Sequence, residues 1–303
     1  MRFGRIADAT IRTVIGVDFS GAAQSGKTAW IAELSAPEPL RLAAPASARL
    51  ASRSPRFRLV SLQPLGRPAG GDDRDRVNRY LVDRIASQSE TFWGCDFPFG
   101  LPIELALGDW QGQLSYVSEF VGSAKEFGLS LVETTERVLG TKHVRRTTDR
   151  ETQTPFDCYH YRIIYQTYHG MREVLAELAD HPNVLVLPFQ YPTAGRGTAS
   201  SILVEACPSS TLKRLGLPHQ RYKQSGGKPP EAVHRRTRRT ILKTVSNYVD
   251  ISSHRRRVIM QDPGGDALDA VLAGLGAWLG FSRADHAAIE SHPRYAREGF
   301  VYC

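Results

Sequence analysis

Short apolar runs and longer amphipathic stretches follow one another along the chain and predict strands and helices in one sheet-containing fold. The runs at the start of the chain come close together, and after them helical and strand-like patterns alternate, which favours an α/β fold whose sheet has mixed strand directions. The strand-like runs are residues 14–19, 28–34, 56–62, 91–96, 184–187 and 201–205. The helical patterns are residues 72–87, 231–249, 266–279 and most of 101–180.

Composition indicates an ordinary globular protein. The 303 residues are 41% hydrophobic and 23% charged, which suffices for a sizeable core, and we expect a single domain over residues 1–303. No apolar run reaches the roughly 18 residues of a membrane span, and the N-terminal sequence has no signal-peptide core. The four cysteines are scattered without a C-x-x-C pair, so we expect no zinc ribbon, no disulfide partner and a cytoplasmic location.

Positive charge is concentrated in residues 211–257. The net charge of the chain is +8, yet this segment holds thirteen basic and only two acidic residues. Such a concentration favours a nucleic-acid partner, although basic helix surfaces are also common without any function. The residues that we expect to contact a nucleic-acid backbone are Arg235, Arg236, Arg238, Arg239, Lys213 and Lys223, with Arg145 and Arg146 as weaker candidates.

The segment from Gly21 to Thr28 matches the phosphate-loop pattern G-x-x-x-x-G-K-[ST]. A phosphate loop must lead from a strand into the N-terminus of a helix, where backbone N–H groups hold the phosphates. The residues after Lys27 fit a strand at least as well, which predicts a glycine-rich hairpin instead. A nucleotide-binding NTPase that uses Lys27 and Thr28, or a kinase of the actin-like fold, stays open as an alternative function.

Five carboxylates occupy positions where they could converge. Asp18, Asp96 and Glu205 end apolar runs, and Asp266 and Asp269 lie three residues apart near the start of a helix. Ligands of α/β sheets gather at the carboxyl ends of the strands. Carboxylates that meet there repel one another unless a cation lies between them, and an oxygen-only set prefers Mg²⁺ or Mn²⁺.

Each of these acids also has an explanation without catalysis. Asp18 and Asp96 could bond backbone N–H groups of their own turns, and Glu205 could pair with a neighbouring arginine. Asp266 lies in the first helical turn, where the helix dipole favours an acid. Asp269 is hardest to explain in this way because its helix is apolar nearly all round, so a buried acid there needs a partner such as a metal.

Four short strings together resemble a known family. The strings G-V-D-F-S-G, C-D-F-P-F-G, V-E-A-C-P-S and G-D-A-L-D-A-V occur in this order from about Val14 to Trp278. They resemble the family catalogued as domain of unknown function 429, which is described as a predicted nuclease with an RNase H-like fold. The D-A-L-D-A string is also similar to the last acidic motif of Holliday-junction resolvases of that fold.

The resemblance implies both a fold and a site. The fold would be a mixed five-stranded sheet whose first three strands are antiparallel and whose first and fourth strands are parallel neighbours. Residues 101–180 exceed what such a core needs and would form a helical insertion. The metal-binding, catalytic acids would be Asp18, Asp96, Glu205 and one or both of Asp266 and Asp269.

The expected reaction is hydrolysis of phosphodiester bonds in nucleic acid by a two-metal-ion mechanism with Mg²⁺ or Mn²⁺. Asp18 would bridge the two ions, and the other acids would complete their coordination. A protein that binds nucleic acid through its basic surface without cutting it remains a third possibility, and it would show a steep salt dependence.

Overall fold

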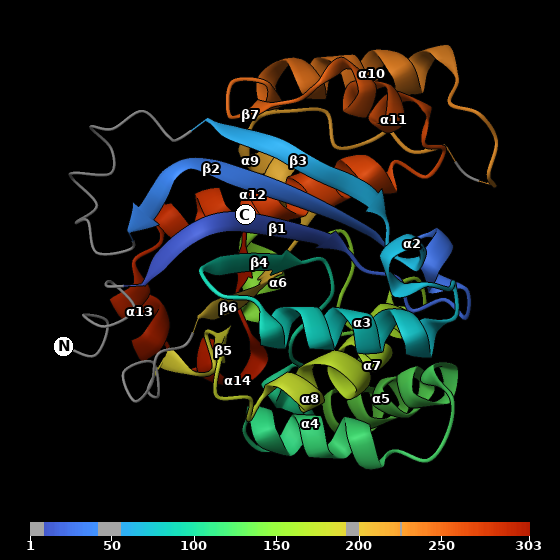
Figure 1. Ribbon diagram of the computed structural model, residues 1–303. Helices are drawn as coiled ribbons and strands as arrows, with labels where there is room; N and C mark the ends of the chain where they lie inside the picture. The colour runs from blue at the N-terminus through green and yellow to red at the C-terminus, as the bar shows by residue number, and fades with distance from the viewer. Residues whose placement is uncertain (1–8, 42–55, 192–199, 225) are drawn as a thin grey trace.

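The computed structural model describes residues 9–41, 56–191, 200–224 and 226–303. These residues form one mixed eight-stranded sheet with the order β5-β6-β4-β1-β2-β3-β7, in which β8 also pairs with β6 (Figure 1). The strands are β1 (Thr10–Asp18), β2 (Trp30–Arg41), β3 (Phe57–Pro64), β4 (Thr91–Cys95), β5 (Val184–Leu187), β6 (Ser201–Ala206), β7 (Val249–Asp250) and β8 (Val301–Tyr302).

The pairing of the first four strands agrees with the expectation from the sequence. β1 pairs with β2 and β2 with β3 in antiparallel fashion, whereas β4 lies parallel to β1 on its other side. The expected count of five strands is wrong, because β5 lies outside β6 and two further strands pair at β3 and β6. Those two strands, β7 and β8, are two residues long and therefore too short to show any periodicity in the sequence.

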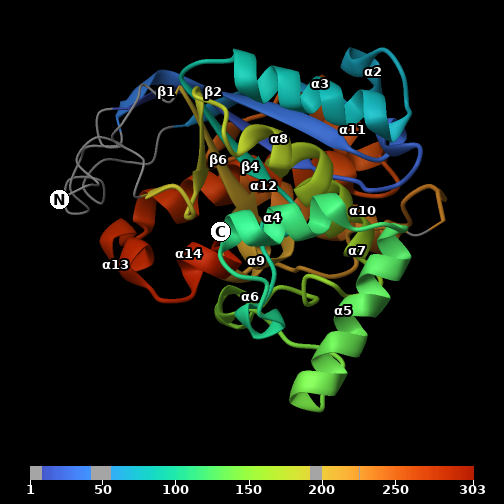
Figure 2. The same cartoon turned by 90° about the horizontal axis from the view of Figure 1, so that it is seen from below.

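Helices cover both faces of the sheet. α9 (Pro208–Arg214), α10 (Ala232–Val245), α11 (Ser253–Gln261) and α12 (Asp266–Arg283) lie on one face. The other face carries α3 (Arg74–Ser87), α4 (Trp110–Glu119), α5 (Ala124–Leu139), α7 (Ile164–Gly170) and α8 (Ala176–Leu178), as Figures 1 and 2 show. The short helices α2 (Gly66–Ala69), α6 (Thr147–Glu151), α13 (His286–Ser291) and α14 (Tyr295–Glu298) lie in the connections. Successive residues of β1 alternate between two cores, with Val14 in one and Ile15 in the other.

The contact between α12 and the central strands depends on residues without side chains. A Cβ atom at Gly16 of β1 would lie 1.9 Å from the carbonyl oxygen of Ala270, and Gly274 of the same helix faces Gly16 in turn. Gly94 of β4 approaches Ala273 in the same way. The helix therefore lies directly on β1 and β4, and this contact fixes the position of its first turn relative to the ends of both strands.

We expect Gly16→Ala to lower the free energy of unfolding by about 1–3 kcal/mol, since the added methyl group meets backbone that cannot turn aside. Urea unfolding followed by circular dichroism measures the change. The matched control is Gly71→Ala, where the nearest atoms belong to the flexible side chain of Arg76. Equal stability of the two variants would contradict the close contact of α12 with the sheet.

The glycine-rich segment after β1 is a hairpin connection, as the sequence favours. A single 3₁₀ turn, Ser25–Lys27, leads directly into β2, and there is no α-helix between β1 and β2. The Lys27 ammonium lies 3.9 Å from a carboxylate oxygen of Asp72, and both side chains are largely solvent-exposed. The strand–loop–helix arrangement that a phosphate loop requires is therefore contradicted. The duplicated core of the actin-like alternative is also not seen within the described residues, which form one sheet.

Two further features bear on the expectations from composition. Within the described ranges, no helix combines the length and the apolar character needed to cross a membrane. Cys95, Cys158, Cys207 and Cys303 are all buried as free thiols.

Candidate active site

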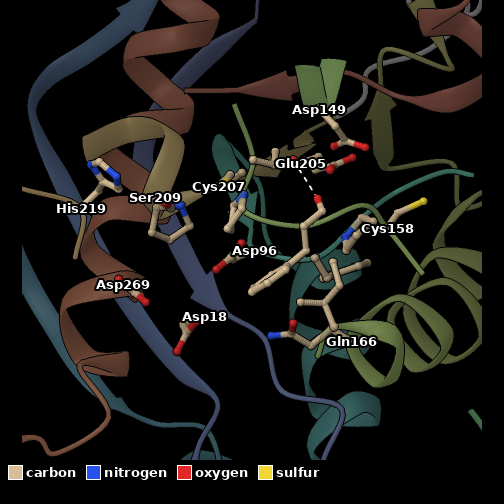
Figure 3. Close-up of a pocket in the computed structure, with 18 of the residues that line it drawn as sticks. Asp18, Asp96, Asp149, Cys158, Gln166, Glu205, Cys207, Ser209, His219 and Asp269 are labelled. Atoms are coloured by element: carbon tan, nitrogen blue, oxygen red, sulfur yellow. Dashed lines mark hydrogen bonds between the residues drawn. The ribbon is translucent and has the colours of Figure 1, made fainter. Parts of the chain in front are cut away.

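A pocket of about 440 Å³ lies beyond the carboxyl ends of β1, β4 and β6. Four of the five acids that the sequence singles out line it, namely Asp18, Asp96, Glu205 and Asp269. In Figure 3 the carboxylates of Asp18, Asp96 and Asp269 gather around one space, whereas Glu205 lies farther away beside Asp149. Four of the five predicted acids thus line one pocket, but they divide into two groups.

Strand pairing brings Asp18 and Asp96 together. Asp18 is the last residue of β1, and Asp96 directly follows β4. The parallel register aligns Val17 with Cys95, and the backbone N–H of Asp96 donates to the carbonyl of Val17 at 2.9 Å. The two carboxylates thus leave adjacent strands at the same level, as parallel pairing predicts.

Asp269 reaches the same space from the first turn of α12. Its side chain is 1% exposed, and the hydroxyl of Tyr222 donates to its Oδ1 at 2.9 Å. Asp266 is the first residue of the helix, is more exposed, and is not among the residues that line the pocket. Of the two candidate acids on this helix, Asp269 is the one that faces the pocket.

Burial changes the ionisation of this group of acids. Burial raises the pKa of Asp18 well above its usual range, and the neighbouring charges of Asp269, Asp266 and Asp96 raise it further. The pKa of Asp96 rises to about 8, through burial and then through the charge of Asp269. Burial also raises the pKa of Asp266 to about 6. Burial, and then the neighbouring carboxylates, therefore disfavour the charged forms of these acids, so that the pocket favours either protons or a cation.

One cation of the chain already lies at the edge of this group. The ammonium of Lys223 contacts Oδ2 of Asp269, and it lies 4.0 Å from Oδ1 of Asp266. Its charge also opposes the rise in the pKa of Asp18. The side chain of Lys223 is 47% exposed, but its ammonium lies where burial lowers the pKa, and the negative charge of Asp269 outweighs this and holds the pKa well above its usual range. Lys223 was expected to contact nucleic acid from the protein surface, and instead it pairs with the acids.

The donor atoms of the pocket suit a hard divalent ion, because they are carboxylate oxygens in a buried setting. Nevertheless, in the part of the chain that the structure describes, no three His, Cys, Asp or Glu side chains stand close enough to hold a metal together. Lys223 occupies one oxygen of Asp269, and Tyr222 the other. The carboxylate oxygens are therefore the kind of ligand that Mg²⁺ or Mn²⁺ prefers. The ion pair of Asp269 with Lys223 has to break before Asp269 can bind such an ion.

Glu205 belongs to a separate buried ion-pair network. Arg146 donates from Nη1 to Oε2 of Glu205 at 2.8 Å and from Nη2 to Oε1 at 2.5 Å, and it also binds Asp149. The N–H of Phe99 donates to Glu205 Oε2 at 2.9 Å. Two expectations are corrected here: Glu205 is paired and not free to act as a metal ligand, and Arg146 lines the pocket as a buried side chain whose guanidinium is held by Glu205 and Asp149. The alternative that Glu205 pairs with an arginine is confirmed.

The predicted basic residues also divide into groups. Arg235, Arg236 and Arg239 are exposed on α10, and Lys213 donates to the carbonyl of Gln153. Arg238 is fully buried, and its guanidinium donates to backbone carbonyls that include those of Tyr222 and Ile259. The expectation that Arg238 contacts nucleic acid is therefore wrong, because this side chain fixes α10 to the segment that carries Tyr222 and Lys223.

Sequence reasoning missed two kinds of residue around the pocket. Tyr222 was not singled out, although it orients Asp269 from 47 residues away. The segment between α6 and α7 lines the opposite wall with Phe156 and Ile163, and nothing in its local pattern connects it to the acids. The aromatic residues around His160 are a signal that could have drawn attention to this segment.

Three comparisons with known proteins found no match to this chain. No family model matches the chain, and neither the curated proteins nor the solved structures include a match to it.

Proposed function

We propose that the pocket is the active site of a metal-dependent nuclease that hydrolyses phosphodiester bonds in nucleic acid. The observation that supports it most is the meeting of Asp18, Asp96 and Asp269, which come from two strand ends and a helix and share one space. Buried carboxylates that repel one another cost stability, and a cation removes that cost. Phosphoryl chemistry is the usual work of such oxygen-only sites.

In this proposal, Asp18, Asp96 and Asp269 would hold Mg²⁺ or Mn²⁺. The bound metal would activate water and neutralise charge on the phosphate. Tyr222 keeps the carboxylate of Asp269 turned toward the pocket through its hydrogen bond. Lys223, released from Asp269, lies at the right place to pair with a phosphate oxygen of the substrate. Because Arg146 holds Glu205, the proposal relies on three carboxylates and not on five.

The order of the strands supports an RNase H-like fold and the resemblance to the domain of unknown function 429 family. The five central strands run β3-β2-β1-β4-β6, with antiparallel pairs among the first three and parallel pairs at β1/β4 and β4/β6. The resemblance implies the antiparallel pairs among the first three strands and the parallel pair of β1 with β4. The strands β5, β7 and β8 and the helices of residues 101–180 are then additions around that core.

Nucleic acid is the substrate that best suits the charges around the pocket. Lys223 and the exposed Arg221 both line it, and Arg235, Arg236 and Arg239 give α10, outside the pocket lining, an exposed positive surface. Basic side chains of this kind neutralise phosphates and carry little sequence information. We therefore expect cleavage that depends weakly on base sequence.

The test is cleavage of labelled oligonucleotides by purified protein. We expect cleavage with Mg²⁺ or Mn²⁺, none with EDTA, and a rate lower by at least about 100-fold in Asp269→Asn, since one anionic donor is lost. The matched control is Asp83→Asn on α3, which neutralises an exposed carboxylate away from the pocket and should leave the rate unchanged.

Circular dichroism of both variants separates loss of activity from loss of the fold. Cleavage by Asp269→Asn at the wild-type rate would show that the activity comes from elsewhere. Failure of folded wild-type protein to cut single-stranded, duplex and branched substrates with either ion would overturn the proposal.

A further inference from the structure

A series of aromatic side chains leads from the wall of the pocket to the protein surface. Phe156 lines the pocket, and the ring of His160 stacks on it with centroids 4.6 Å apart and planes at 19°. The ring of Tyr161 follows, with its centroid 4.4 Å from that of His160. Tyr161 is 71% exposed, and Tyr165, on α7, is 44% exposed. We call Phe156, His160, Tyr161, Arg162 and Tyr165 the aromatic rim.

A positive charge accompanies these rings. The guanidinium of Arg162 lies 5.6 Å from the ring centroid of Phe156 and 5.7 Å from that of Tyr161. Arg162 is exposed, and its Nε donates to the hydroxyl of Tyr161 at 3.1 Å. The rim thus offers flat π faces and a cation on one surface, which is the combination that binds bases by stacking and phosphates by charge.

The exposure of the two tyrosines is not explained by the core. Six large hydrophobic side chains are exposed among the described residues, and the only aromatic ones are Tyr161 and Tyr165. Other aromatic residues of the same face, such as Phe127 and Tyr168, are buried in its core. Tyr161 is joined through the ring of His160 to Phe156 in the pocket wall, so a ligand that extends from the pocket along these rings covers it.

Of the aromatic rim, Phe156 lines the same pocket as the acids, and the other members lie beyond it. Figure 3 shows Gln166 of α7 on the side of Asp18 away from Asp269. The amide of Gln166 donates to the carbonyl of Phe19, directly after Asp18, and this hydrogen bond ties α7 to the end of β1. The helix that carries Tyr165 is therefore held next to the strand end that carries Asp18.

We propose that the aromatic rim stacks unpaired bases of single-stranded nucleic acid and so delivers the neighbouring phosphate to the acidic pocket. This inference rests on the proposed function and names its substrate class. In a duplex, each base already stacks on its neighbours and its faces are closed to a protein ring, whereas a single strand offers them. The rim therefore favours single strands, frayed ends or unpaired flaps over continuous duplex.

The test is a binding measurement that needs no catalysis. Asp18→Asn protein in EDTA is titrated against three fluorescently labelled probes of equal length: an oligothymidylate, an abasic strand with the same phosphates, and a blunt duplex. We expect the oligothymidylate to bind at least about 10-fold more tightly than the abasic strand, because each stacked base contributes about 1–3 kcal/mol. The duplex should bind more weakly than the oligothymidylate.

Substitutions then locate the effect. Tyr161→Ala should weaken oligothymidylate binding by about 5- to 20-fold and leave abasic binding unchanged, whereas Tyr161→Phe, which keeps the ring, should bind normally. Leu139→Ala removes an exposed apolar side chain on α5 and serves as the control. Equal affinity for the oligothymidylate and the abasic strand, or no effect of Tyr161→Ala, would overturn the inference.

The two proposals fail in distinguishable ways. If the wild-type protein never cuts but Tyr161→Ala loses base-dependent binding, the rim is supported and the nuclease is not. If the wild-type protein cuts with Mg²⁺ but binding ignores the bases, the nuclease is supported and the rim is overturned.

Discussion

Arg146→Met is expected to lower the free energy of unfolding by about 3–5 kcal/mol, because removing one partner of a buried ion pair leaves the other partner's charge buried and unpaired. Arg146 is 1% exposed and neutralises two buried carboxylates, Glu205 and Asp149. It also donates to the carbonyl of Glu298, so that it joins β6, α6 and α14. Methionine fills a similar volume but leaves both acids without their cation.

Urea unfolding measures this loss, and the matched control is Arg137→Met on α5, where the same exchange occurs at an exposed position. Adding Glu205→Gln to Arg146→Met should restore part of the stability, because one of the two unpaired charges disappears. A loss below about 1 kcal/mol in Arg146→Met, or no recovery in the double variant, would show that the network contributes little.

The strands and the position of the acids could be predicted because both depend on local sequence. Residues 91–96 form a short apolar run that ends in an acid, and the structure has β4 there with Asp96 directly after it. The parallel pairing that places Asp18 beside Asp96 is implied by the family resemblance and not by the local pattern, and the register of β1 with β4 agrees with it. The close contact of α12 with the sheet depends on small residues on both sides, Gly16 and Gly94 on the strands and Ala270, Ala273 and Gly274 on the helix.

The partners of the charged residues could not be predicted, because they come from distant parts of the chain. Arg146 and Glu205 are 59 residues apart, and the contact of Lys223 with Asp269 depends on the path of the segment before α10. Arg238 is a different case, since it shares a helical face with Ile241, Leu242 and Val245. That spacing indicates burial, but the density of arginines around it favoured a surface role.

Two substitutions at the acidic pocket should change the affinity for a divalent metal ion in opposite directions. Asp18→Asn should weaken Mg²⁺ or Mn²⁺ binding by two to three orders of magnitude, since a unit charge at about 4 Å contributes about 4 kcal/mol at intermediate dielectric. Lys223→Met should strengthen binding, because it frees an oxygen of Asp269 and removes a competing cation. One partner of this pair has a half-exposed side chain, so we expect a gain of only about 3- to 10-fold.

Isothermal titration calorimetry of the ion, without nucleotide or nucleic acid, measures both changes. Lys27→Met is the matched control, because Lys27 is exposed and pairs only weakly with Asp72 at the far end of the hairpin connection. It should bind the ion as the wild type does. Weaker binding in Lys223→Met would mean that the lysine supports the metal site instead of competing for it. Unchanged binding in Asp18→Asn would remove Asp18 from the site, and with it the argument that the ends of β1 and β4 build a metal centre.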